Sequence, residues 1–411
     1  MTTPSTSARM HYGYIIVACC CLIMGVDIGL TFSCAGIFYR PVSESLGVSV
    51  GSFGIYMSIM YVTSTLMLPY AGRLIERYSA RWLLTGSSAL MGLVFVSMAF
   101  YSSLWEFYAA GAVLGLTLAF LLYLSFPTLV NRWFHTRVGL MIGICSAASG
   151  VGGMLFNPLG GWLITSWGWR WAYALFGLLI LLIVSPLLAL FLSDSPKAKG
   201  LLPFGYKAVG GGAADKPFAP EAEGMTYGEA RRTPLFYALV FFAFLMMGTS
   251  TLNLFIPGFV TDHGFSLEAA SFTAAAAMAG VTIGKLALGW VNDRNCSAGV
   301  AVTCGAGAAG LLLMLVAAGS LPLIATGAFL FGWAYAGVTV QSAMLTRAVF
   351  GVRDYARIYA TMSMGLAAGG AIASGGWGLL SDATSLAVSF TTGAILLLLC
   401  LLIGLYALRR R

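Results

Sequence analysis

Two charged residues lie deep inside apolar segments of this sequence, and they are the groups best suited to carry chemistry. Lys285 stands in an apolar run that begins near Leu267, and no other Lys or Arg lies as far inside such a run. Asp27 is the only acidic residue deep in an apolar run. An ammonium group at the depth of a bilayer costs at least ~2.5 kcal/mol. A sequence keeps such charges where they line a cavity, find a partner or bind a ligand.

Lys285 can bind an anion as a point charge, and a buried lysine can also release its proton. The alternative is a side chain that extends to the lipid headgroups. Lys285 precedes Val291, at the end of its run, by a helix rise of roughly 9 Å, which is too deep for comfortable extension. We therefore predict that Lys285 binds substrate or takes part in coupling.

Asp27 is the predicted proton-coupling residue. An unpaired carboxyl group at this position is expected to be protonated, because burial disfavours the charged form. The alternatives are permanent pairing with Lys285 and a local hydrogen bond of the neutral acid. By helix rise the two residues lie roughly 10 Å apart in depth, so direct pairing is not assured.

Polar and aromatic side chains in other apolar runs form a second tier of candidates. Each could hydrogen-bond a carboxylate or a hydroxyl group, and for each the alternative is an ordinary interhelical hydrogen bond. The predicted substrate-binding set adds to Lys285 the residues Tyr123, Asn253, Tyr335 and Gln341. Weaker candidates are Tyr61 and Asn157. His263, beside Asp262, is interpreted as a residue of an external turn, with a role in a gate as the alternative.

The elements that must position these residues are transmembrane helices. The chain of 411 residues is 59% hydrophobic and 9% charged, with a mean hydropathy of +0.89. Soluble domains carry about 25% charged residues, so lipid must be the solvent here. Apolar runs of about 20 residues predict transmembrane helices. Twelve such runs occur, at roughly 13–37, 51–71, 82–102, 106–130, 138–164, 170–192, 234–258, 267–291, 297–318, 321–345, 355–379 and 383–408.

A polar segment divides these runs into two sets of six. We predict an N-terminal six-helix bundle over 1–192, a cytoplasmic linker over 193–233 and a C-terminal six-helix bundle over 234–411. With a cytoplasmic N-terminus, all but three of the 22 Lys and Arg residues fall on the cytoplasmic side, as the positive-inside rule requires. The net charge of +8 therefore reflects topology, not nucleic-acid binding. We expect a multi-pass protein of a plasma membrane, such as a bacterial inner membrane, with both termini cytoplasmic.

An internal repeat supports the division into halves. Gly72-Arg-Leu-Ile-Glu-Arg77 follows the second run and Gly289-Trp-Val-Asn-Asp-Arg294 follows the eighth, at an offset of 217 residues. Each copy places an acid and an arginine at the cytoplasmic mouth of a helix pair. We predict that these gating residues latch the cytoplasmic side in the outward-facing state: Glu76, Arg77, Asp293 and Arg294.

These motifs resemble the major facilitator superfamily. Gly72-x-Leu-x-Glu-Arg-x-x-x-Arg81 is similar to its loop signature, with Glu76 in the usual Asp place and Ser79 where Gly is usual, and Gly168-Trp-Arg-Trp-Ala-Tyr173 resembles the start of its sixth helix. Within it the chain most resembles the oxalate/formate antiporter and monocarboxylate transporter group, through Tyr12-Gly-Tyr-Ile-Ile-Val17, Gly36-Ile-Phe38 with Pro41, and Asn131-Arg-Trp-Phe134. The resemblance implies an all-α membrane protein with twelve transmembrane helices in two pseudo-symmetric six-helix bundles.

The resemblance also bears on the site. In the resembling transporters an Arg in a Gly-Arg-x-x-x-Gly setting binds the substrate carboxylate, and Gly284-Lys285-x-x-x-Gly289 keeps that setting with Lys. Their usual proton-carrying acid is replaced here by Val281, and the second cation of oxalate exchangers is missing from 358–380. In that superfamily the fifth and eighth helices cross between the halves. The small-residue pairs Gly139/Gly143 and Gly280/Gly284 are therefore expected to permit rocking at that crossing.

We predict a secondary active transporter of small organic anions, a proton-coupled carrier of monocarboxylates such as lactate, pyruvate or formate. The alternatives within transport are an anion exchanger and a carrier of a larger hydrophobic carboxylate; the alternatives outside it are a membrane receptor and an intramembrane enzyme. The sequence shows no catalytic constellation, cofactor motif or metal-ligand spacing among its eight cysteines. The expected partners are the substrate anion, protons and the bilayer, without nucleic acid, and the chain is expected to act as a monomer.

Overall fold

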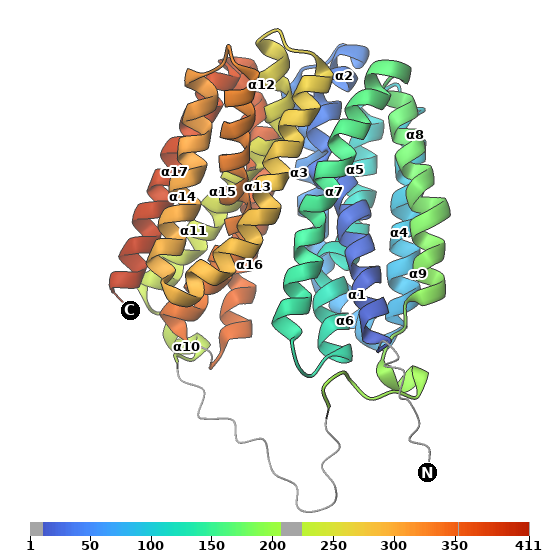
Figure 1. Ribbon diagram of the computed structural model, residues 1–411, viewed down its shortest axis with the longest axis vertical. Helices are drawn as coiled ribbons and strands as arrows, with labels where there is room; N and C mark the ends of the chain where they lie inside the picture. The colour runs from blue at the N-terminus through green and yellow to red at the C-terminus, as the bar shows by residue number, and fades with distance from the viewer. Residues whose placement is uncertain (1–10, 207–223, 352, 411) are drawn as a thin grey trace, which may run out of the picture.

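The computed structural model describes residues 11–206, 224–351 and 353–410, and the side chains of Pro69, Gly72, Glu76, Gly139 and Ala356 lie outside that description. Figure 1 shows two groups of helices side by side, one blue to green and one yellow to red. The start of α1, helix α10 and the end of α17 lie at one end of both groups. We call it the linker end and the opposite end the loop end. The middle of the predicted linker lies outside the described residues.

Six spans form the first group, and three of them combine several helical segments. In chain order they are α1 (Gly13–Leu22) with η1 (Ile23–Ser33) and α2 (Ala35–Leu46); α3 (Val50–Arg77); α4 (Ala80–Met98); α5 (Leu104–Leu118) with η2 (Ala119–Leu124) and α6 (Ser125–Trp133); α7 (Val138–Trp167); and α8 (Trp169–Leu179) with η3 (Ile180–Val184) and α9 (Ser185–Phe191).

The second group follows the short helices η4 (Pro196–Lys199) and α10 (Tyr227–Ala230). Its spans are α11 (Pro234–Ser250) with η5 (Thr251–Phe255) and α12 (Ile256–Asp262); α13 (Leu267–Arg294); α14 (Cys296–Val316); α15 (Leu321–Phe350); α16 (Tyr355–Ala383); and α17 (Leu386–Arg409).

The twelve predicted spans are therefore all present as helices. Among the described residues, eleven of these helices are long and apolar enough to cross a membrane, judged by length and composition. The remaining one, α16, holds six glycines within its 29 residues, which lowers its hydropathy. The first span extends well past the predicted end at residue 37, because the apolar run stops there while the helix continues to Leu46 and ends at Gly47, whose φ is +66°.

Four spans depart from α-helical geometry near their middle. Segments η1, η2 and η3 are π-helical and η5 is a 3₁₀ turn. Asp27 lies in η1, Tyr123 in η2 and Asn253 in η5. Such irregular turns inside helices often mark functional sites. Three of the four segments hold a predicted residue, and η3 holds none.

The two groups meet along α7 with α13 and along α3 with α16. The glycines that allow the α7–α13 approach are Gly150 and Gly153, where a Cβ would collide with Thr282 and Met278 of α13. The prediction that Gly280 and Gly284 serve this crossing was wrong. Their faces are turned to α15 inside the second group, because one helix presents different small-residue faces to different neighbours. Gly143 faces open space, since a Cβ added there would meet no atom within 4 Å, and Gly139 lies outside the description.

Candidate functional site

Lys285 projects from α13 across the contact between the two groups. Its ammonium group donates hydrogen bonds to the carbonyl oxygen of Ser146 at 2.9 Å and to Oγ of Ser149 at 3.2 Å, both on α7. These acceptors are uncharged. Over the described part of the chain, the ion pairs all involve Arg40, so the charge of Lys285 has no counter-charge there. An ammonium has three N–H donors, and one remains for a ligand.

Further polar groups continue from this lysine into the first group. Ser33 Oγ donates to the carbonyl oxygen of Ser149 at 3.3 Å, and Asn157 Nδ2 donates to the carbonyl oxygen of Ser33 at 3.0 Å. Oδ1 of Asn157 is buried without a hydrogen-bond partner among the described residues. The sequence singled out Asn157 but not Ser33 and Ser149, because serines are common in membrane helices and nothing in the sequence indicates which ones face Lys285.

Asp27 is completely buried in η1, and neither carboxylate oxygen has a hydrogen-bond partner in the described chain. Ser88 of α4 lies near the carboxylate, outside hydrogen-bond geometry. Thr31, one turn later, donates to Sδ of Met91 on α4 at 3.3 Å. In contrast, Gly29 packs against Gly152 of α7. Asp27 thus lies on the face toward α4, away from the helix that binds Lys285, and no ion pair joins the two charges.

Three tyrosines from three spans approach one another between the two groups. Tyr61 of α3 lies within electrostatic range of Tyr123 of η2 and of Tyr335 of α15, and Tyr123 lies within the same range of Tyr335. The ring of Phe32 in η1 lies 5.3 Å from the ring of Tyr61. Two residues of the predicted substrate set, Tyr123 and Tyr335, are therefore neighbours, together with the weaker candidate Tyr61.

The other two residues of that set lie in different surroundings. Asn253 is 4% exposed and its Oδ1 has no partner among the described residues. Gln341 is fully buried and accepts a hydrogen bond from Asn292 Nδ2 at 3.0 Å. The amide of Gln341 is thus engaged within the second group, the ordinary interhelical arrangement that was its alternative interpretation.

The predicted latch residues are exposed at the linker end. Arg77 lies over the ring of Tyr78 at 5.8 Å and Arg294 over the ring of Trp290 at 3.6 Å. Asp293 is exposed, and the side chain of Glu76 lies outside the described residues. Among the three latch residues whose side chains are described, Arg77, Asp293 and Arg294, no ion pair joins the two groups. The latch stays a prediction.

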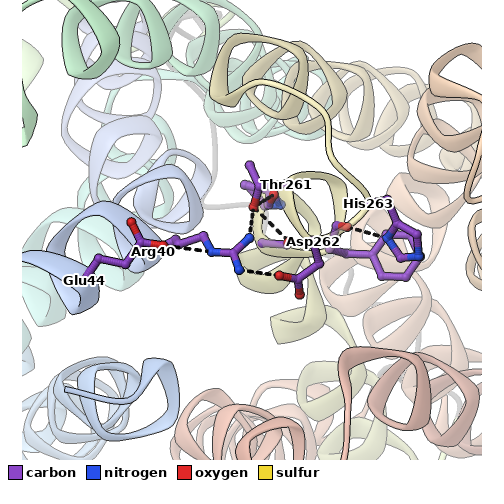
Figure 2. A network of polar contacts seen from close by, with 8 residues as sticks. Arg40, Glu44, Thr261, Asp262 and His263 are labelled. Carbon is purple, nitrogen blue, oxygen red and sulfur yellow. Dashed lines mark hydrogen bonds and ion pairs between the residues drawn. The ribbon is translucent and has the colours of Figure 1, made fainter. Parts of the chain in front are cut away.

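Polar contacts join the two groups at the loop end instead. Arg40 Nη2 lies 2.5 Å from Asp262 Oδ1, and Arg40 Nη1 donates to Thr261 Oγ1 at 2.6 Å (Figure 2). Nearby, the backbone N–H of Gly51 donates to Asp382 Oδ2 at 3.0 Å. His263 does not take part: its Nδ1 bonds to the carbonyl oxygen of Phe259 at 2.8 Å. The loop end is therefore closed by contacts between the groups.

The chemistry available to this arrangement is binding and proton carriage. Lys285 offers a charge for an anion, the tyrosines offer hydroxyl donors, and Asp27 is a buried acid. Among the described residues no three His, Cys, Asp or Glu side chains lie together as metal ligands would.

Two curated transporters are similar to parts of this chain. Monocarboxylate transporter 3 of Mus musculus is 28% identical over 174 residues, 41% of this chain and 34% of that protein. The oxalate:formate antiporter of Oxalobacter formigenes is 25% identical over 233 residues, 56% of this chain and 50% of that protein. The chain thus spans about a third to a half of the length of these curated relatives.

Solved structures and a family profile cover nearly the whole chain. A bacterial homolog of the human lysosomal transporter Spinster, in an inward-facing and unoccupied conformation, matches with a TM-score of 0.74 over 97% of both chains at 16% identity, which shows a shared fold. The profile of the Major Facilitator Superfamily matches residues 21–295 and 243–411. The chain therefore belongs to the Major Facilitator Superfamily of membrane transporters, as its loop motifs predicted.

Proposed function

We propose that this protein is a proton-coupled transporter of small organic monocarboxylates and that Lys285 binds the carboxylate. The observation that carries the proposal is the unbalanced charge of Lys285 at the contact between the groups. Its acceptors, Ser146 O and Ser149 Oγ, are neutral, so they offset part of the desolvation and leave the positive charge in place. A carboxylate is a ligand that would balance it.

The substrate class is supported by two further features. The relatives named above are a monocarboxylate transporter and an oxalate:formate antiporter. A single cation suits one carboxylate better than two. Tyr123, Tyr335 and Asn253 complete the proposed binding set as hydrogen-bond donors, while Gln341 is left out because Asn292 engages it.

Asp27 is the proposed proton carrier. Burying an unpaired charge costs far more than burying a neutral acid, so a carboxyl group in these surroundings is expected to hold a proton through part of the cycle. Its position away from Lys285 would let the proton and the substrate occupy separate sites. The transport path would open alternately at the two ends. The loop end is held together by polar contacts in this conformation, and the linker end would be held by the Arg77 and Arg294 latch when the loop end is open.

The transporter also has a proposed orientation in the membrane. With residues 1–192 and 234–411 as the two halves and 193–233 as a cytoplasmic linker, the linker end faces the cytoplasm and the loop end faces outward. This follows from the Lys and Arg distribution. We further propose that one chain is sufficient for transport.

A carrier of a larger, hydrophobic carboxylate is the second candidate. The contact between Phe32 and Tyr61, at 5.3 Å, and the neighbouring tyrosines would provide apolar rings for the body of such an acid. Simple anion exchange is the third candidate, since the relative from Oxalobacter formigenes is named for it.

Counterflow into proteoliposomes tests these alternatives. Purified protein is reconstituted with lactate, pyruvate, formate, oxalate or benzoate inside, and uptake of the same radiolabelled acid is followed with and without an imposed pH gradient. We expect counterflow with monocarboxylates and accumulation driven by the pH gradient alone. Uptake that requires an internal anion indicates exchange, and a preference for benzoate indicates the larger class. The absence of counterflow with every acid would overturn the proposal.

A further inference from the structure

We propose that Arg40 is a carboxylate-binding residue at the loop end, bound by Asp262 in the conformation seen here and by the carboxylate of an external substrate when the two halves part. This inference rests on the proposed function, because it requires the substrate to be a carboxylate and the loop end to face outward. It assigns a first contact site, separate from Lys285, to the outer mouth of the transport path.

The three sides of the Arg40 guanidinium have different partners. Nε lies 3.2 Å from Glu44 Oε1, one turn along the same helix α2. Nη2 and Nη1 bind Asp262 and Thr261, which lie at the end of α12 in the other half (Figure 2). When α2 and α12 move apart, Glu44 stays with Arg40, while Asp262 and Thr261 leave. The two Nη groups are then exposed side by side, in the fork that binds carboxylates with two hydrogen bonds.

The partial exposure of the Arg40–Asp262 ion pair favours exchange of partners over permanent closure. The side chains of Arg40 and Asp262 are 37% and 42% exposed, and ion pairs at such exposure contribute little net stability. A dissolved carboxylate can therefore compete with Asp262 for the same guanidinium. Arg40 also lies at the carboxyl end of α12, where a positive charge is favourable. This attraction lets the site close again after the substrate has moved inward.

Arg40 lies directly beside the apolar closure of the loop end. One turn earlier on α2, Gly36 packs against the backbone of Leu254, and Tyr39 lies 5.4 Å from the ring of Phe255. A carboxylate held by Arg40 would thus prevent Asp262 from returning and would keep this closure open while the substrate moves in. The inference therefore predicts that the substrate and Asp262 oppose each other.

Kinetics in opposite directions test the competition. Radiolabelled lactate, or the best acid of the panel above, is offered to oriented vesicles from outside or from inside. Asp262→Asn removes the internal competitor, so the external KM should fall by about two- to fivefold, the range that exposed ion pairs are worth. Arg40→Ala removes the site, so the external KM should rise about tenfold or more. The internal KM should change little in both variants.

Two control variants are matched to these changes. Arg170 is the other arginine at the loop end, but its guanidinium binds the carbonyl oxygen of Tyr101 and Ser45 Oγ within the same half. Glu44→Gln removes the carboxylate that stays with α2. Arg170→Ala and Glu44→Gln should leave the external KM within about twofold of the wild-type value. If Asp262→Asn and Arg40→Ala shift the external KM in the same direction, Arg40 is only a gate and the inference is overturned.

A labelling experiment separates this inference from the proposed function. Ser43 is 2% exposed and, at helical spacing from Gly36 and Arg40, lies on the face of α2 turned to the other half. In a variant lacking the native cysteines, Ser43→Cys is labelled from outside with a membrane-impermeant maleimide. Lactate, formate or benzoate should speed labelling several-fold when Arg40 is present and should have no effect in Arg40→Ala. No effect of any acid with Arg40 present would overturn the inference even if transport is normal, whereas an effect without transport would overturn only the proposed function.

Discussion

Replacing Lys285 by Gln is the most informative single change, because it removes the charge and keeps an amide that can donate to α7. If a substrate carboxylate binds the ammonium, losing one partner of a desolvated, hydrogen-bonded charge pair costs about 2–5 kcal/mol. At 1.4 kcal/mol per factor of ten, the affinity should fall by roughly 30- to 4,000-fold. By contrast, a bond from the ammonium to α7 is worth about 1.5–3 kcal/mol, but it is present with and without substrate, so its loss should lower stability more than affinity.

Ser149→Ala is the matched control for that comparison. It removes the 3.2 Å hydrogen bond between Ser149 Oγ and the Lys285 ammonium and leaves the charge, so the affinity should change by about fivefold or less. Binding of radiolabelled lactate to the purified protein in detergent measures both variants without requiring transport. If Lys285→Gln binds within about fivefold of the wild-type protein, as Ser149→Ala does, Lys285 is a structural contact between the halves and the proposed site is wrong.

Lys285→Arg then asks whether the lysine must lose its proton during the cycle. Arginine keeps a fixed charge and grips a carboxylate with two hydrogen bonds. If Lys285 only holds the substrate, the Arg variant should bind and support at least partial transport. Binding without turnover would show that deprotonation of Lys285 is part of the mechanism, and the role of Asp27 would have to be reconsidered.

Three further predictions follow from the positions of other residues. Asp27→Asn should abolish accumulation driven by a pH gradient but retain exchange, and continued accumulation in that variant would place the proton carrier elsewhere. Arg77→Ala should slow turnover while substrate affinity stays within a few-fold, whereas a large loss of affinity at unchanged turnover would contradict a latch. Gly152→Ala should destabilise the protein by about 1–3 kcal/mol, because the added methyl group would collide with the backbone of Gly25; a lower melting temperature in detergent would show this. Gly143→Ala is the control, since Gly143 faces open space, and it should be neutral or slightly stabilising. Equal effects of the two changes would refute the packing argument.

The sequence was sufficient for the helices because lipid imposes a simple rule on them. A span needs about 20 apolar residues, and every predicted run became a helix. Helix ends were less accurate, as α2 shows, since Arg40 and Glu44 leave the apolar run without ending the helix. The assignment to the superfamily depended on short motifs such as 72–81, whose residue types and spacing resemble its loop signature.

The direction in which each candidate points could not be predicted to the same degree. Asp27 and Lys285 were recognisable because a charge in an apolar run is costly. The sequence did not show that Asp27 and Lys285 lie on different sides of α7. The reason is that η1 is π-helical, which rotates every following residue relative to its place in an ideal α-helix. The same applies to Tyr123 in η2 and to Asn253 in η5. Serines that bind Lys285 gave no signal, since a hydroxyl group costs little in a helix that supplies its own carbonyl acceptors.

The exceptions to the charge distribution prove more informative than the distribution itself. The Lys and Arg residues that the positive-inside rule leaves unexplained are Lys285, Arg40 and Arg170. Two of the three bind across the halves in this structure: Lys285 to α7 and Arg40 to α12. Arg170 instead lies 4.1 Å over the ring of Trp169 and bonds within its own half. The positive-inside rule gives no reason for a cation at these three positions, and under the proposed function the direct reason is the path of the anion. Charge distribution identifies such residues but not their partners, because residues such as Arg40 and Asp262 are far apart in the sequence and are brought together only by the fold.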